Sequence, residues 1–176
     1  MDIRILKFED IGSYLAQCEI LDSESGNSGV YYGPYSKNDV YPIDELRKLT
    51  EERWSKDLDT PGWRRAWGVF DGDKIVGSGD VAGGDLKTNL HRVNLGMGIL
   101  KEYRGKGNGK KLLEVIIEWC GRQESVMWID LGVFSGNRKA ERLFINSGFM
   151  IDSVVPDSWR IDTYIINQTN MTLYVG

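Results

Sequence analysis

Few residues of this sequence could build a metal site or a disulfide framework. One histidine and two cysteines occur among its 176 residues. Cys18 and Cys120 lie far apart, each in a segment with a helical pattern, so we expect two buried free thiols rather than a disulfide. Because neither a CxxC nor an HExxH pattern occurs, the sequence predicts no metal site.

Long apolar runs and a dominant charge of either sign are also missing. No stretch reaches 18 apolar residues, so we expect no transmembrane helix, and the opening MDIRILKFED lacks the layout of a signal peptide. The formal net charge is −4, from 22 basic and 26 acidic residues, which argues against a general nucleic-acid or anionic-membrane surface. We therefore expect a cytoplasmic protein without nucleic-acid or membrane partners, a monomer or homodimer with a single domain over residues 1–176.

What the sequence does contain is a mixed order of strand and helix patterns. Alternating apolar residues predict strands, and apolar residues at helical spacing predict helices. The expected strands cover 3–8, 63–70, 74–82, 90–100, 127–134, 149–155 and 160–175, with a turn at Pro156-Asp157 before the last. The expected helices cover 9–20, 42–58, 109–122 and 137–147. This order predicts an α/β (α+β) fold around a central sheet.

A glycine-rich stretch, GILKEYRGKGNGKKLL at 98–113, joins a strand that ends at Leu100 to a helix that begins near Gly107 to Gly109. Backbone N–H groups at a helix start lack partners, and the helix dipole favours negative charge there. Glycine lets a ligand approach the backbone closely, so the stretch predicts a phosphate or pyrophosphate cradle. The alternative is a plain strand–turn–helix connection in which the glycines only make the turn.

Three phosphate-binding patterns compete for this stretch. A P-loop needs a hydroxyl residue where Lys111 stands, and in a Rossmann fingerprint the third glycine would be misplaced. The pattern R/Q-x-x-G-x-G/A, after a strand and opening a helix, matches fully from Arg104 to Gly109. Here the chain resembles the GNAT superfamily of N-acetyltransferases, whose pyrophosphate loop for acetyl-CoA has this form. A nucleotide-phosphate protein on another fold stays as a lesser alternative.

A second segment extends the resemblance. NRKAERLFINSGF, at 137–149, is similar to the family's N-x-x-A-x-x-L-[YF]-x-x-x-G-F segment, and residues 90–150 carry most of the likeness. The resemblance implies the GNAT fold, a mixed central sheet with flanking helices, in which the parallel strands 4 and 5 splay apart around acetyl-CoA. It also implies direct transfer of the acetyl group to a primary amine of a small molecule, or to a protein N-terminus or lysine.

The cofactor contacts implied by the resemblance follow the family's motifs. The pyrophosphate would meet the backbone from Arg104 to Gly109, and the pantetheine would pair like an extra strand with Met97 and Ile99. Asn137 would contact the cofactor, and as a helix N-cap it also has a structural reason to be there. The full implied set is Met97, Gly98, Ile99, Arg104, Gly105, Lys106, Gly107, Asn108, Gly109, Lys110, Asn137 and Phe144.

The family's usual acid and base are absent from the matching positions. Strand 90–95 reads LHRVNL and has no glutamate, and Phe144 stands where many relatives have a proton-donating tyrosine. We expect His91 or Asp80 as base, since His91 alone has an unperturbed pKa near neutrality, and Tyr164 as acid. The alternative that these absences leave open is a non-catalytic acyl-CoA-binding module.

A loop at 22–41 with four tyrosines lies where family members cover the acceptor site. Aromatic rings can hold a cation or a flat amine, and they can equally pack over the first two helices. From this loop we take Tyr31 and Tyr32 as substrate-binding residues. Asn94 is the third, as a residue that orients a water or the acceptor.

Overall fold

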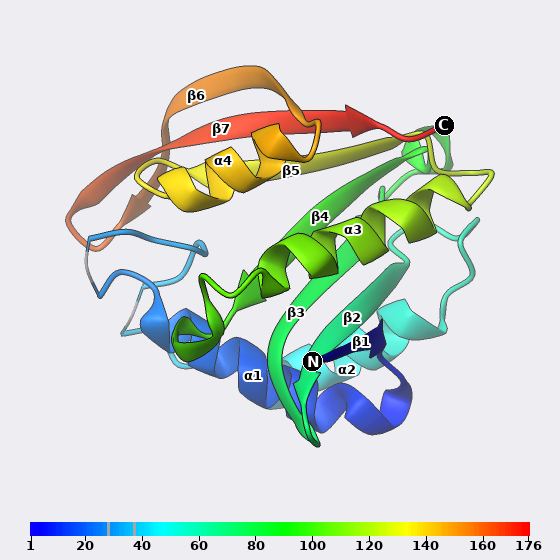
Figure 1. Ribbon diagram of the computed structural model, residues 1–176, viewed down its shortest axis with the longest axis horizontal. Helices are drawn as coiled ribbons and strands as arrows, with labels where there is room; N and C mark the ends of the chain where they lie inside the picture. The colour runs from blue at the N-terminus through cyan, green and yellow to red at the C-terminus, as the bar shows by residue number, and fades with distance from the viewer. Residues whose placement is uncertain (28, 37) are drawn as a thin grey trace.

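The computed structural model describes residues 1–27, 29–36 and 38–176 (Figure 1). The strands are β1 (Asp2–Ile5), β2 (Arg64–Asp71), β3 (Lys74–Gly83), β4 (Arg92–Ile99), β5 (Trp128–Phe134), β6 (Met150–Ile161) and β7 (Tyr164–Tyr174). The helices are α1 (Ile11–Glu24), α2 (Ile43–Ser55), α3 (Asn108–Gly121) and α4 (Arg138–Asn146), with short 3-10 helices at Phe8–Asp10, Lys87–Asn89 and Lys101–Tyr103. Within the described ranges, no helix has the length and apolar character needed to cross a membrane.

All seven strands form one sheet in the order β1-β2-β3-β4-β5-β7-β6. In Figure 1, α3 and α4 lie in front of the sheet, and α1 and α2 lie behind it. Neighbouring residues of β3 point to these two sides: the Ser78 hydroxyl donates to Gln17 of α1, while a Cβ on Gly79 would touch Ile116 of α3. The predicted α/β (α+β) class is confirmed.

The parallel strands β4 and β5 pair only at their beginnings. Their register runs from Arg92 opposite Trp128 to Asn94 opposite Asp130, and both strands then continue without pairing to each other. β4 keeps its antiparallel pairing with β3 up to Ile99, and β5 keeps its pairing with β7 along its whole length. Because each strand follows its other neighbour, the two separate, and the splayed pair that the resemblance implied is present.

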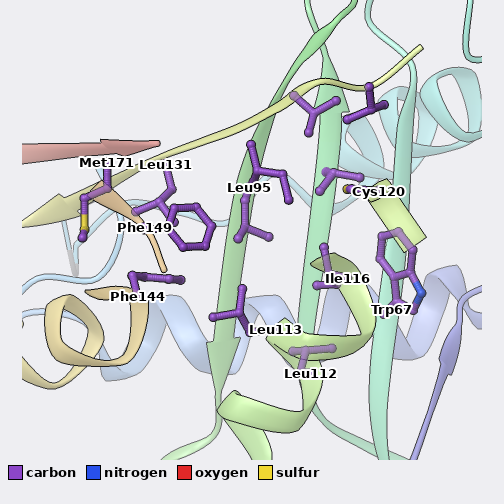
Figure 2. Close-up of a cluster of buried hydrophobic side chains, with 14 of the residues drawn as sticks. Trp67, Leu95, Leu112, Leu113, Ile116, Cys120, Leu131, Phe144, Phe149 and Met171 are labelled. Atoms are coloured by element: carbon purple, nitrogen blue, oxygen red, sulfur yellow. The ribbon is translucent and has the colours of Figure 1, made fainter. Parts of the chain in front are cut away.

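The main core lies between the sheet and the helix α3. The apolar face of α3 is fully buried against the strands, and α4 lies beside α3 on the same side of the sheet and adds Phe144 to the core (Figure 2). Residues labelled there include Trp67, Leu95, Leu112, Leu113, Ile116, Cys120, Leu131, Phe144, Phe149 and Met171. Both cysteines are free thiols, with Cys120 buried and Cys18 partly buried. This packing fixes the start of α3 against the open ends of β4 and β5.

The last hairpin differs from the sequence prediction. The predicted turn at Pro156-Asp157 is wrong, because β6 continues through it to Ile161 and the chain reverses at Asp162, which has φ 53°. A register shift between Val155 and Trp159 takes up Pro156 and Asp157 as a bulge. β6 is an edge strand, so the N–H that proline lacks is not needed there.

Candidate active site

The loop after β4 borders open space with its backbone. Gly105 and Gly107 have φ 74° and 83°, and a Cβ added to either would meet no atom within 4 Å. Gly107 is the N-cap of α3, no side chain caps the helix, and Lys111 N–H donates to the Gly107 carbonyl (3.1 Å). The N–H groups from Asn108 to Lys110 precede this first helical bond and are free to bind an anion.

The loop's own side chains hold it in shape. Asn108 Nδ2 donates to the Tyr103 carbonyl (3.0 Å), and Arg104 Nε donates to the Ile99 carbonyl (2.6 Å). Arg104 also pairs with the carboxylate of Glu24 at the end of α1. The positive charge of Arg104 is therefore directed to α1, so an anion at this loop would meet backbone N–H groups and the exposed lysines at 106, 110 and 111.

Two glycines of β4 that face α1 have different surroundings. A Cβ on Gly98 would lie 2.6 Å from Leu21 Cδ1, so this glycine is required by packing against α1. A Cβ on Gly96 would meet only Asp80 Oδ2, at 3.6 Å. Open space therefore lies over Gly96, just beyond the last β4–β5 pair at Asn94.

Asp80 stands beside this space. It pairs in register with Gly96, Tyr14 Oη of α1 donates to its Oδ2 (3.5 Å), and Arg64 Nε lies 3.3 Å from its Oδ1. Its side chain is 19% exposed. Burial raises the pKa of Asp80, and the charge of Arg64 and the hydrogen bond from Tyr14 oppose that rise. A carboxylate with a raised pKa suits proton transfer better than an ordinary one does.

The other two predicted catalytic residues lie elsewhere. His91 is exposed and precedes β4, where its carbonyl accepts the N–H groups of Met127 (2.8 Å) and Trp128 (3.1 Å). From His91 to Gly96 the strand advances about 16 Å, at ~3.3 Å per residue. Tyr164 begins β7, is 48% exposed, and has no hydrogen bond to Asp80 among the described residues. The structure therefore does not bring the three candidates together.

The predicted loop at 22–41 is shorter than expected, because α1 runs to Glu24. Two of its positions, 28 and 37, lie outside the described residues. Tyr31 is buried, and its hydroxyl donates to Asp162 Oδ2 (2.5 Å) on the β6–β7 hairpin. Tyr32 is 43% exposed, with its ring centroid 4.9 Å from Arg104 Cζ. The loop is thus attached both to the hairpin and to the loop that follows β4.

Two more of the implied cofactor residues have structural contacts. Asn137 is the N-cap of α4, and its side chain accepts the Ala140 N–H (3.3 Å). Phe144 is buried in the core, and its ring centroid lies 5.5 Å from that of Phe149 (Figure 2). Capping and packing account for both residues, and their cofactor contacts stay predictions.

Sequence reasoning missed the polar side chains that α1 and β2 place around Asp80. Tyr14 and Cys18 lie one helical turn apart on the sheet-facing side of α1, and Arg64 comes from β2. Burial, and then the charge of Asp80, raise the pKa of Cys18 to about 12, so this thiol is not a nucleophile at neutral pH. The available signal in the sequence was the spacing of Tyr14 and Cys18, which are four residues apart in the predicted first helix.

A polar groove of about 600 Å³ lies further along the sheet, past the pair formed by Asp80 and Gly96. Ala82 pairs with Asn94, the next residue pair on the same face after Asp80 and Gly96, and both line the groove. Its other walls come from α2, β5, β6 and β7. The polar groove is defined here by Arg53, Ala82, Asp85, Asn89, Arg92, Asn94, Asp130, Asp152, Gln168, Asn170 and Thr172.

Comparisons with known proteins agree on this architecture. The sequence model of the Acetyltransferase (GNAT) family matches residues 31–149. A GNAT-family acetyltransferase from Streptococcus pneumoniae aligns with TM-score 0.85 at 20% identity, covering 99% of each chain. Ribosomal-protein-alanine N-acetyltransferase from Brucella melitensis aligns with TM-score 0.80 at 17% identity, again covering 99% of each chain.

A further similar structure contains ligands. Spermidine N-acetyltransferase from Vibrio cholerae, in complex with CoA and spermine, aligns with TM-score 0.74 at 18% identity over 99% of this chain and 95% of that one. No curated protein matches the chain in a sequence comparison. At these identities the solved structures show the fold, and the family model shows the family.

Proposed function

Since this chain belongs to the GNAT acetyltransferase family, we propose that it transfers the acetyl group of acetyl-CoA directly to a primary amine. The observation that carries the proposal is the splay of β4 and β5 after Asn94 and Asp130, followed on β4 by a helix start without a side-chain cap. Asp80 stands at the side of the same gap, over Gly96. The glycine-rich loop, the gap and Asp80 thus all adjoin β4.

Acetyl-CoA would lie in the gap, held mainly by backbone groups. The pyrophosphate would accept N–H groups between Gly105 and Lys110, which have no side-chain cap. The pantetheine would run along the free edge of β4 at Met97 and Ile99, where β5 no longer pairs. Asn137, the N-cap of α4, stays a predicted contact of the cofactor.

Attack on the thioester requires the neutral, deprotonated form of the amine. Asp80 would accept that proton from the ammonium group, which its raised pKa favours. The nitrogen then attacks the thioester carbonyl, the carbon–sulfur bond breaks, and the nitrogen releases its second proton as the amide forms. Tyr164 stays the predicted acid: it would donate its proton to the departing thiolate and regain one from the nitrogen, and positioning alone can supply much of the rate.

The acceptor remains a primary amine of a small molecule, or a protein N-terminus or lysine. The similar structures name an alanine N-acetyltransferase and a spermidine N-acetyltransferase, both of which act on amines. The second candidate function is a non-catalytic acyl-CoA-binding module, which the missing glutamate on β4 and the buried Phe144 favour. Three further properties stay predictions: a cytoplasmic location, a single domain over residues 1–176, and a monomeric or homodimeric state.

Calorimetry and a thiol assay test the proposal. We expect CoA to bind, ATP and NAD to bind far more weakly, and a panel of primary amines to release free CoA thiol from acetyl-CoA. Binding of ATP or NAD without binding of CoA would contradict the proposal. Binding of CoA with no thiol release from any amine would support the binding module instead.

The base is tested by the pH dependence of the rate. Asp80→Asn should lower kcat by about 100-fold or more, as is typical for loss of a general base, and remove the acid limb of the profile. That limb should lie above the ordinary carboxyl range, because the pKa of Asp80 is raised and the required ionised form is lost as the pH falls. His91→Ala is the comparison variant, and a flattened acid limb in that variant alone would assign the base to His91.

A further inference from the structure

Two glycines flank the point at which β4 and β5 separate. The last residues that pair between these strands are Asn94 and Asp130. Gly96 and Gly132 follow two positions later, so they face the same side of the sheet as that pair and place no side chain at the opening. Asp80, which pairs with Gly96, faces this side too. The opening is therefore bordered by Asp80 on its β4 side and by whatever covers Gly132 on its β5 side.

The side-chain amide of Gln168 covers Gly132. A Cβ added to Gly132 would lie 2.6 Å from Gln168 Nε2 and 2.7 Å from its Cδ, so the amide occupies the place of a side chain there. Gln168 comes from β7, which pairs with β5 along this stretch, and it lines the polar groove together with Gly132 and Asn94. The opening thus has a carboxylate on one side and an amide on the other.

Hydrogen bonds fix which end of this amide lies over Gly132. Trp159 Nε1 donates to Gln168 Oε1 (2.7 Å), and because an indole N–H can only donate, the atom that it contacts has to be the oxygen. Gln168 Nε2 donates to Asn170 Oδ1 (2.7 Å), and Asn170 Nδ2 donates to Ser153 Oγ (3.1 Å). The amide nitrogen is therefore held at the opening, with its oxygen turned toward β6.

One N–H of this amide is available to a ligand. An amide nitrogen carries two hydrogens, and Gln168 Nε2 has a single acceptor, Asn170, among the residues that the structure describes. The described lining of the polar groove beside it holds three aspartates and two arginines, which gives a formal charge of −1. A neutral oxygen atom therefore suits the free N–H better than a second anion does.

We propose that Gln168 determines the acceptor specificity by donating this N–H to a carbonyl oxygen next to the reacting amine. The inference rests on the proposed function. The acceptor is then an α-aminoacyl compound, such as the N-terminus of a peptide, with its amine at Asp80 and its first carbonyl at Gln168. Amine and carbonyl oxygen are separated by two carbon atoms, so the first residue spans the opening and the following residues enter the polar groove.

Other primary amines fit this arrangement less well. A lysine side chain and a polyamine have no oxygen atom near the reacting nitrogen, so the free N–H of Gln168 would lose its water without gaining a partner. A free amino acid offers a carboxylate, which the negative charge of the groove disfavours. A neutral aminoacyl group meets neither obstacle.

Paired acceptors test this inference in the thiol assay. Each amino-acid amide is compared with the amine in which a methyl group replaces the carboxamide, and the preference is the ratio of the two kcat/KM values. The basicity of the two amines affects this preference equally in the wild type and in every variant. We expect the preference to fall about 2- to 10-fold in Gln168→Met, the range for one hydrogen bond, because methionine keeps the length of the side chain but lacks the donor.

Two further variants separate recognition from packing. Trp159→Phe keeps a ring beside Phe134 but removes the N–H that orients the Gln168 amide, so the preference should fall by a smaller factor. Gln123→Met is the matched control, because Gln123 donates to the Trp119 carbonyl (3.0 Å) at the end of α3, outside the groove as described. It should keep the wild-type preference. An unchanged preference in Gln168→Met, or an equal fall in Gln123→Met, would overturn the inference. Circular dichroism checks that each variant is folded.

A binding measurement separates this inference from the proposed function. Calorimetry with CoA-saturated protein should show tighter binding of the amides than of the matched amines, and a smaller difference in Gln168→Met. Thiol release without any preference that depends on Gln168 would end the inference alone. A Gln168-dependent preference in binding without thiol release would keep the recognition and refute the transfer. Neither thiol release nor binding of any amide would refute both.

Discussion

Replacing Gly107 by alanine tests whether the glycine-rich loop binds a cofactor or merely makes a turn. Gly107 has φ 83°, in the left-handed region, and it caps α3. An added Cβ would meet nothing within 4 Å, so no clash arises inside the protein. The methyl group would instead project into the open space where a pyrophosphate has to approach the N–H groups of the helix start.

Two separate effects follow from this geometry. Alanine in the left-handed conformation costs about 1 to 2 kcal/mol, which should lower the free energy of unfolding by that amount. Loss of one hydrogen bond to a charged phosphate costs about 1.5 to 3 kcal/mol, which corresponds to about a 10- to 100-fold rise in the Kd for CoA. The first effect arises in either reading of the loop, whereas the second arises only if the loop binds the cofactor.

Gly72→Ala is the matched control for the strain. Gly72 lies in the β2–β3 turn, has φ 60°, and an added Cβ there also meets nothing within 4 Å. Urea unfolding should show a similar loss of stability in both variants, and calorimetry should show a weakened CoA affinity only in Gly107→Ala. If Gly107→Ala lost stability and kept the wild-type Kd, the glycines would only make the turn and the reasoning would be refuted.

Two further predictions concern carboxylates of α1. Burial raises the pKa of Asp22 from its ordinary 3.8 to about 6, so its ionised form destabilises the fold above pH 6 and has no such effect below pH 4. Asp22→Asn should therefore raise the free energy of unfolding by about 1 kcal/mol at pH 7.5, allowing for solvent screening, and urea curves should converge with the wild type near pH 4. Glu24→Gln removes the charge that pairs with Arg104 and so loosens the loop after β4. Calorimetry should then show a several-fold higher Kd for CoA. An unchanged Kd would mean that the loop keeps its shape without this pair.

The helix start and its glycines could be predicted because they depend on neighbours in the chain. The spacing from Arg104 to Gly109 predicted a backbone anion site, and the structure has left-handed glycines and an uncapped helix at that place. Asn137 was predicted as an N-cap and is one. The turn at Pro156-Asp157 was wrong because local turn residues also fit a bulge in an edge strand, and only pairing with β7 distinguishes the two.

The surroundings of Asp80 could not be read from the sequence. Tyr14, Arg64 and Asp80 are far apart along the chain, and their contacts depend on the register of three elements. The same holds for Gly98, whose lack of a side chain is required by Leu21 of α1. His91 was chosen for its residue type alone, because the sequence does not show which strand positions lie opposite each other.

The sequence by itself determined the order of elements, the glycine-rich start of α3 and the absence of the usual glutamate from the strand before it. These are properties of spacing and residue type, which the chain carries locally. Only the tertiary structure decided that β4 leaves β5 after Asn94, that Asp80 stands over Gly96, and that Tyr14 and Arg64 meet Asp80 there. The physical reason is that strand register and buried charge pairing depend on which distant segments pack together.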